Sequence, residues 1–182
     1  FGGRYASVPK RRNPTMICAV NMYLQTFVLC ALMRDNPFGA MVFTSTSLRT
    51  AVTAWCNPWL NEVSATSTYG DIKDWDVGNV DSFNDLFVNC SEWPAQFNAD
   101  ISKWNTGSVT SFYKTFHYQV VFNVDISKWN TAASTTFELM FNGARMFNQP
   151  IGEWNTAAST NFANMFKDNS EFNQPIGDWD TG

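Results

Sequence analysis

His117 is the only histidine of the 182-residue chain, and imidazole is the side chain best suited to acid–base chemistry near neutral pH. Catalysis would require a partner, such as a serine or cysteine nucleophile paired with the imidazole, and the sequence offers no such pair. The corresponding positions of neighbouring segments carry Val88, Asn142 and Lys167. Such a mixture is typical of an exposed helix position. We therefore predict no catalytic residue and no enzymatic activity.

Three carboxylates, Asp71, Asp74 and Asp76, surround Trp75 and could suggest a calcium site. Calcium loops place oxygen ligands at ordered positions, and these aspartates lack that spacing. We interpret them as solvated turn residues. No zinc-type spacing of Cys and His occurs either, so we predict neither a metal nor another cofactor.

The four cysteines are Cys18, Cys30, Cys56 and Cys90, and the first two lie in an apolar stretch. A chain cleaved after that stretch would keep only Cys56 and Cys90. These two could form a disulfide after secretion, and two unpaired buried thiols are the alternative that we favour.

Residues 1–40 combine a basic flank with an uncharged apolar segment, residues 16–33. This layout is typical of a secretory signal or a membrane anchor. The segment has about the minimum length that spans a bilayer, and its polar residues weaken a spanning role. A buried helix and an artefact of the gene model are the other interpretations. The chain begins at Phe1 and stops just after a repeat has begun, so we expect a longer protein.

The charge is unevenly distributed along the chain. Residues 1–68 hold six basic and two acidic side chains, whereas residues 69–182 hold six basic and fourteen acidic ones. The second part therefore has a net charge of −8 and repels phosphate backbones, which argues against nucleic acid as a partner.

A 25-residue period of tryptophans organises the second part of the chain. The period is set by Trp104, Trp129, Trp154 and Trp179, and the interval from Trp75 to Trp104 is longer by four. Phenylalanines recur at the eighth and twelfth positions after each full-repeat Trp and at the seventh position before the next. These registers take twelve of the sixteen Phe. The aromatic richness is therefore a property of the repeat.

Each 25-residue unit contains two local patterns. The two Phe after each Trp are four residues apart, as in Phe112 and Phe116, which predicts a short helix with Thr110 as its N-cap. Apolar residues alternate from Phe97 to Ile101, which predicts a short strand. Pro150 disagrees with the strand because proline removes a ladder donor, so we expect the strand to be very short.

A single unit buries too little apolar surface to fold alone, so the units must stack and form columns of equivalent residues. We expect the Trp column to fill the core and the column of Asn98, Asn123, Asn148 and Asn173 to satisfy turn backbone. Residues 46–63 carry helical patterning with Thr46 or Ser47 as a cap. The predicted organisation is thus a helical N-terminal cap at 41–68 and, at 69–182, about four 25-residue repeats plus a truncated fifth.

The phrases FNADISKWNTGSVTSFYKTF at 97–116, FNQPIGEWNT at 147–156 and FNQPIGDWDT at 172–181 resemble the repeat of BspA-type leucine-rich-repeat surface proteins of bacteria and protists. The resemblance covers about residues 45–182. It implies an α/β fold, a right-handed leucine-rich-repeat-like solenoid of short parallel strands and short helices. It also implies secreted or cell-surface placement and adhesion or interaction roles, without catalytic residues. Ser134 and Ser159 depart from the pattern where Val is expected. We therefore expect looser coils there, with Ala133 and Ala158 taking up the packing.

The residues that remain outward-facing next to the predicted strands suggest an interaction face. They are Asp100, Ser102, Lys103, Asp125, Ser127 and Lys128. We expect a protein or cell-surface ligand there, with membrane contact only through the N-terminal segment. A structural envelope or end-to-end assembling role is the alternative, and glycan binding through exposed Trp is a weaker one. Asn89 begins an Asn-Cys-Ser glycosylation acceptor, which matters if the chain is exported in a eukaryote.

Overall fold

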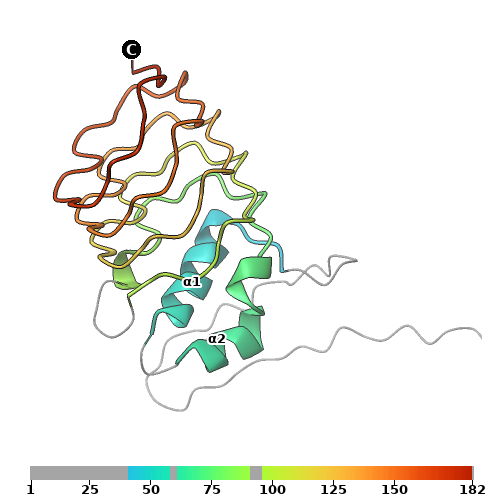
Figure 1. The fold of residues 1–182 in the computed structure, drawn as a ribbon. Helices are drawn as coiled ribbons and strands as arrows, with labels where there is room; N and C mark the ends of the chain where they lie inside the picture. The colour runs from blue at the N-terminus through green and yellow to red at the C-terminus, as the bar shows by residue number, and fades with distance from the viewer. Residues whose placement is uncertain (1–40, 58–60, 91–95, 182) are drawn as a thin grey trace, which may run out of the picture. The chain divides into compact units, whose positions relative to one another are not determined.

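A computed structural model describes residues 41–57, 61–90 and 96–181, all within one structural unit that spans Met33–Gly182. Its elements are α1 (Ser45–Trp55), α2 (Asn61–Tyr69) and the single 3-10 turns η1 (Ile72–Asp74) and η2 (Val88–Cys90). The rest of the described chain runs in irregular coils stacked from η1 towards the C-terminus (Figure 1). The predicted signal-like or anchor-like segment at 16–33 lies outside the described residues.

The N-cap of α1 is Thr44, two residues before the nearer of the two caps predicted from the sequence, Thr46 and Ser47. The hydroxyl of Thr44 accepts a hydrogen bond from the Ser47 N–H, and the Ser47 hydroxyl accepts one from the Thr44 N–H, which forms a capping box. Leu48, Ala51 and Val52 form the buried face of the helix.

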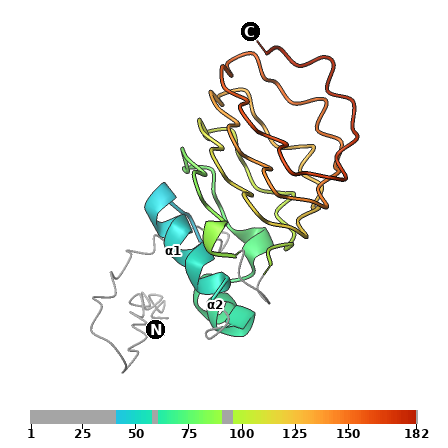
Figure 2. The same cartoon turned by 90° about the vertical axis from the view of Figure 1, so that its left-hand side faces the viewer.

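Contacts on either side of α1 join it to the first coil. Just before the helix, the Phe43 ring lies 4.8 Å from the Trp75 ring, centroid to centroid. Near its C-terminal end, Trp55 packs edge-on against Phe97 at 5.4 Å. Helix α1 therefore covers the first coil, and the C-terminal coil lies at the far end of the stack (Figure 2).

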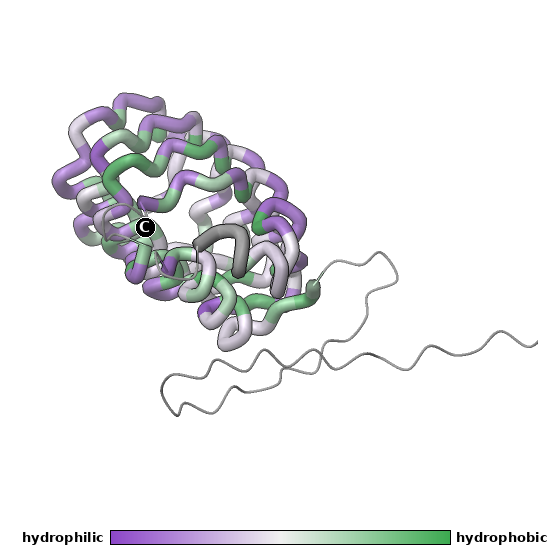
Figure 3. The backbone as a smooth tube through the Cα atoms, turned by 90° about the horizontal axis from the view of Figure 1, so that it is seen from below, coloured by the Kyte–Doolittle hydropathy of each residue, from purple (hydrophilic) through white to green (hydrophobic). Residues whose placement is uncertain are grey.

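Aromatic rings fill the space enclosed by the coils. Equivalent rings of successive coils lie 5.2 Å apart for Phe87 and Phe116 and 6.3 Å apart for Trp75 and Trp104, with interplanar angles of 8° and 14°. Polar and apolar stretches alternate along each coil (Figure 3), so each turn contributes side chains both to this core and to the surface. The predicted Phe columns and Trp column are confirmed. Trp75, Trp104, Trp129 and Trp154 are buried and Trp179 in the last described coil is partly buried, so the described coils present no column of exposed Trp side chains.

The predicted fold class is wrong. The α/β reading required a leucine-rich-repeat-like solenoid of short parallel strands and short helices. The described residues contain two short α-helices, both ahead of the repeats, and no strand. The segments 97–101 and 122–126, where strands were expected, contain neither a strand nor a bridge. Isolated parallel bridges join successive coils at Ser82–Ser111, Ser111–Thr136 and Thr136–Asn161, where the short helices were expected to begin.

An alternating hydrogen-bond pattern explains why no helix forms between the two Phe of a repeat. The N–H groups of Phe112, Lys114 and Phe116 donate to carbonyls of the next coil at 2.9–3.1 Å. The intervening N–H groups, those of Thr115 and His117, donate to carbonyls three residues earlier. A helix would direct every N–H to the carbonyl four residues back, so these bonds to the next coil would be lost.

Side chains also replace the expected strand. The Asn123 N–H donates to Asn98 Oδ1 at 2.9 Å, and the Asn148 N–H donates to Asn123 Oδ1 at 3.0 Å. The predicted asparagine ladder is therefore confirmed. Because side-chain amides join the coils here, Pro150 and Pro175 remove no bond between coils, which resolves the conflict with the strand.

The two serines that replace Val are buried and hydrogen-bonded. Ser134 Oγ donates to the Val109 carbonyl at 2.9 Å, and Ser159 Oγ donates to the Ser134 carbonyl at 2.5 Å. Ala133 and Ala158 are exposed, so the expectation that these alanines take up the packing is wrong. The hydroxyls add bonds between coils in place of the lost apolar contact.

Cys56 and Cys90 form a disulfide, with their Cα atoms 5.0 Å apart. The interpretation as two unpaired buried thiols is therefore wrong. The bond links the residue after α1 to the end of the first coil, across 34 positions of sequence. It ties the helical part to the stack.

Candidate functional site

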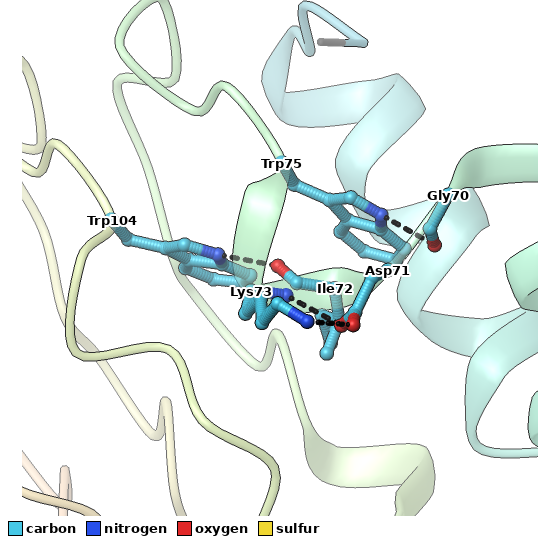
Figure 4. Close-up of polar contacts among 6 residues, drawn as sticks. All are labelled: Gly70, Asp71, Ile72, Lys73, Trp75 and Trp104. Carbon is cyan, nitrogen blue, oxygen red and sulfur yellow. Dashed lines mark hydrogen bonds and ion pairs between the residues drawn. The ribbon is translucent and has the colours of Figure 1, made fainter.

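The tryptophan of each coil is anchored to the coil before it. Trp104 Nε1 donates to the Ile72 carbonyl at 2.9 Å, and Trp129 Nε1 donates to the Ile101 carbonyl at 3.1 Å. Trp75, which has no preceding repeat, donates instead to the Gly70 carbonyl at 3.1 Å (Figure 4). These bonds fix the backbone just before each Trp, and that segment carries the predicted interaction face.

Asp100 and Asp125 hold this segment in a tight turn. Asp100 Oδ1 accepts hydrogen bonds from the N–H and the hydroxyl of Ser102, at 3.0 and 2.7 Å. Asp125 Oδ1 accepts one from the Ser127 N–H at 2.9 Å. These bonds lower the pKa of both carboxyl groups, with smaller contributions from nearby lysines. Part of each carboxylate therefore serves the turn, and the rest faces solvent.

Lys103 and Lys128 follow these turns as exposed side chains. Among the described residues, neither ammonium group has a hydrogen bond or an ion-pair partner. In the first coil, Lys73 differs because it pairs with Asp71, which lowers the pKa of that carboxyl group (Figure 4). The structure thus places a carboxylate, a hydroxyl and an unpaired lysine ammonium group close together in sequence in each of two adjacent coils.

The other residues considered from the sequence are His117, the aspartates around Trp75 and Asn89. His117 is half-buried, and desolvation followed by the charge of Lys114 lowers its pKa. Within the described ranges, no group of three or more His, Cys, Asp or Glu side chains could hold a metal ion. Asn89, the glycosylation acceptor, is exposed in η2 beside the disulfide.

One surface hollow was not anticipated from the sequence. It has a volume of about 610 Å³ and is lined by Tyr118, Gly143, Arg145, Asp168, Asn169 and Ser170, from three successive coils. Tyr118, Gly143 and Asp168 are at equivalent positions, the fourteenth after the Trp of each coil. The sequence signal that could have indicated it is variation at one repeat position. An aromatic residue, a glycine and an acid occupy this position in successive coils, whereas each core position keeps a single residue type.

These features define a repeat protein whose repeated residues build an aromatic core. The family described as "Mycoplasma protein of unknown function, DUF285" matches residues 59–179, and the chain belongs to this family. No curated protein and no solved structure matches the chain. Among the described residues, no helix is both long and apolar enough to cross a membrane.

Proposed function

We propose that this chain is part of a non-enzymatic, surface-associated repeat protein of BspA type that acts in adhesion or protein recognition. The observation that carries the proposal is that each coil uses different residues for its core and for its surface. The repeated Phe, Ile and Trp residues face inward, and two adjacent coils present the same acid, hydroxyl and free lysine outward.

The geometry favours binding over a purely solvating role for these side chains. The Ser102 N–H donates to Asp100, and Trp129 Nε1 donates to the Ile101 carbonyl, so both bonds fix the backbone that leads into Lys103. A lysine on a fixed turn loses less freedom on binding than one on a mobile loop. We expect the partner to present acidic groups to Lys103 and Lys128, at the spacing of neighbouring coils.

The disulfide supports placement outside the reducing interior of the cell. Disulfides persist in secreted and surface proteins and are rare in the cytosol. The bond between Cys56 and Cys90 joins two buried side chains and closes a loop across 34 positions, so it contributes to the stability of an exported chain.

Placement is tested by labelling cells that produce the natural protein with an antibody raised against residues 96–181. We expect intact cells to be labelled. Labelling that requires permeabilisation would contradict surface placement and, with it, recognition of a partner at the cell surface.

Recognition is tested with beads that carry the chain and with intact cells as the binding surface. Lys103→Glu with Lys128→Glu should reduce bead attachment by about tenfold at low salt, and less at high salt because exposed charges are screened. Lys167→Glu, an exposed lysine elsewhere on the stack, is the matched control. Equal attachment of the double variant and the unmodified chain would refute the face. Asp100→Asn keeps the oxygen that clamps the turn and tests its charge alone.

Assembly is the alternative function, in which the stacked coils contribute to an envelope or join end to end. Sedimentation velocity of the chain tests it. Concentration-dependent association would favour assembly over recognition by a monomer.

A further inference from the structure

The hollow around Tyr118 differs from the rest of the surface because it combines an exposed aromatic ring with charged groups that have no partner among the described residues. The Tyr118 side chain is 52% exposed, which is unusual for a large apolar ring in this chain. It lies at one end of the hollow, in the second of the stacked full repeats, and Arg145 and Asp168 come from the next two coils.

The absence of a side chain at Gly143 allows the Tyr118 ring to lie where it does. A Cβ atom added to Gly143 would stand 2.4 Å from Tyr118 Cδ1, well inside contact distance. The ring therefore rests on the glycine backbone, and Gly143 is buried beneath it. Gly143 itself has φ of +72°, which a glycine adopts without strain. The Tyr118 ring thus packs on the backbone of Gly143 and also contacts the His117 ring, with centroids 4.2 Å apart. About half of the Tyr118 side chain remains exposed.

The backbone around the hollow is already satisfied. The Tyr118 N–H donates to the Asn142 carbonyl at 2.8 Å, and the Gly143 N–H donates to the Lys167 carbonyl at 2.8 Å. Asn169 is also committed, since its Nδ2 donates to the Phe147 carbonyl and its Oδ1 accepts the Phe172 N–H. These bonds build the walls of the hollow and leave other groups for a ligand.

Three groups remain available. In the part of the chain that the structure describes, neither the Arg145 guanidinium, the Asp168 carboxylate nor the Tyr118 hydroxyl has a hydrogen bond or an ion-pair partner. The hollow therefore offers donors, acceptors and an apolar plane together, with one positive and one negative charge. A ligand suited to it has many hydroxyl groups, no strong net charge and a face of C–H groups that packs on the ring.

We infer that this hollow binds a neutral saccharide, with one sugar ring against Tyr118 and its hydroxyls bonded to Arg145 and Asp168. A volume of about 610 Å³ lies in the range of small-ligand sites. Six lining residues are far fewer than the roughly 20 to 30 that a stable protein interface uses on each side. The inference concerns a different surface from Lys103 and Lys128, so it stands or fails separately from the recognition proposal.

The test uses the full chain, labelled with ¹⁵N, and three neutral probes: maltotriose, cellotriose and triacetylchitotriose. We expect at least one probe, at about 10 mM, to shift the amide signals of Tyr118, Gly143 and Ser170 in a saturable way. The mixed-charge peptide acetyl-Arg-Asp-amide is titrated in parallel. Binding of the peptide alone would overturn the saccharide assignment, and so would the absence of shifts with all three sugars.

Substitutions separate binding from folding. Tyr118→Asn removes the ring and suits the left-handed backbone at this position, where φ is +57°, so the fold should be kept. It should weaken sugar binding by about tenfold or more, and Arg145→Gln and Asp168→Asn by about tenfold each. Tyr113→Asn, the same change at a tyrosine outside the hollow, is the control. Shifts that survive Tyr118→Asn, or that Tyr113→Asn abolishes equally, would refute the site.

Discussion

Gly152 and Gly177 occupy the same place in the two copies of the phrase Pro-Ile-Gly, and the structure predicts opposite results when each becomes alanine. A Cβ atom at Gly152 would lie 2.4 Å from the carbonyl oxygen of Pro175 in the next coil. A Cβ atom at Gly177 would meet nothing within 4 Å, because no coil of the described chain follows it. Neither glycine has a positive φ, so backbone strain does not distinguish them.

The clash sets the magnitude. Ordinary contact would require the Pro175 backbone to withdraw by about 1 Å, and this would also pull apart the ring columns between the two coils. Overpacking of this kind costs about 1–3 kcal/mol, and replacing glycine with alanine recovers roughly 0.4–1 kcal/mol by restricting the unfolded chain. Gly152→Ala should therefore lower the free energy of unfolding by about 1–2 kcal/mol. Gly177→Ala should raise it by up to about 1 kcal/mol.

Thermal unfolding followed by near-ultraviolet circular dichroism would report both variants through the stacked tryptophans. We expect the Tm to fall by roughly 2–8 °C for Gly152→Ala and to stay level or rise for Gly177→Ala. The paired substitution Pro150→Asp with Gly152→Ser introduces the phrase Asp-Ile-Ser of the preceding coil. In that coil Ser127 has a Cβ atom although Pro150 occupies the coil that follows. The pair should be less destabilising than Gly152→Ala. Equal losses for the two single glycine variants would refute the reasoning, because the cost would then belong to the turn and not to the coil above it.

Three further predictions follow from the contacts between coils and from one titrating group. Asn123→Ala removes the acceptor of the Asn148 N–H and should cost about 1–2 kcal/mol in urea unfolding, whereas Asn173→Ala should cost less than about 0.5 kcal/mol since Asn173 Oδ1 accepts no hydrogen bond among the described residues; equal costs would contradict the ladder. Reduction of the Cys56–Cys90 bond, which spans 34 positions, should cost about 3–4 kcal/mol, and a reductant should leave the Tm of the double alanine variant unchanged; no Tm change on reducing the unmodified chain would contradict this. Burial lowers the pKa of His117 below 6.5, so as the pH drops below about 6.5 the unfolded chain binds a proton before the folded chain does and the free energy of unfolding falls. His117→Asn should remove this contribution, measured as the difference in stability between urea titrations at pH 7.5 and 5.5. The same difference in the variant and the unmodified chain would exclude a contribution from His117.

The core of this protein was predictable from the sequence because its signal is a repeated residue type at a fixed spacing. Phe112 and Phe137 are both buried and stack at 5.5 Å, as a 25-residue period of identical aromatic residues requires. The ladder of Asn98, Asn123 and Asn148 was predictable for the same reason. In each case a side chain of one type must meet its own equivalent in the next coil.

The absence of a helix between Phe112 and Phe116 could not be predicted from the sequence. Two apolar residues four positions apart are compatible with a helix and with the observed turn equally. The hydrogen bonds to the next coil decide between them, and those bonds are long-range. Serine at 134 shows the same limit. Its type suggested a loosened core, yet the carbonyl of Val109 in the preceding coil gives its hydroxyl a partner at 2.9 Å.

Backbone conformation explains both the missed turns and the unforeseen hollow. Six non-glycine residues in the described part of the chain have left-handed backbone: Asp85, Lys114, Tyr118, Leu139, Asn164 and Asp168. Each stands at the tenth or the fourteenth position after a Trp, so the alternating bonds between coils impose this conformation whatever residue is present. This conformation costs a residue such as tyrosine or leucine about 1–2 kcal/mol of conformational free energy, whereas Gly143, at the equivalent position of the next coil, adopts it without this cost. Packing explains Leu139, which is half-buried, whereas Tyr118 packs on Gly143 and His117 and leaves about half of its side chain in solvent. Binding of a ligand to the exposed part of the ring would add a reason for a tyrosine at position 118.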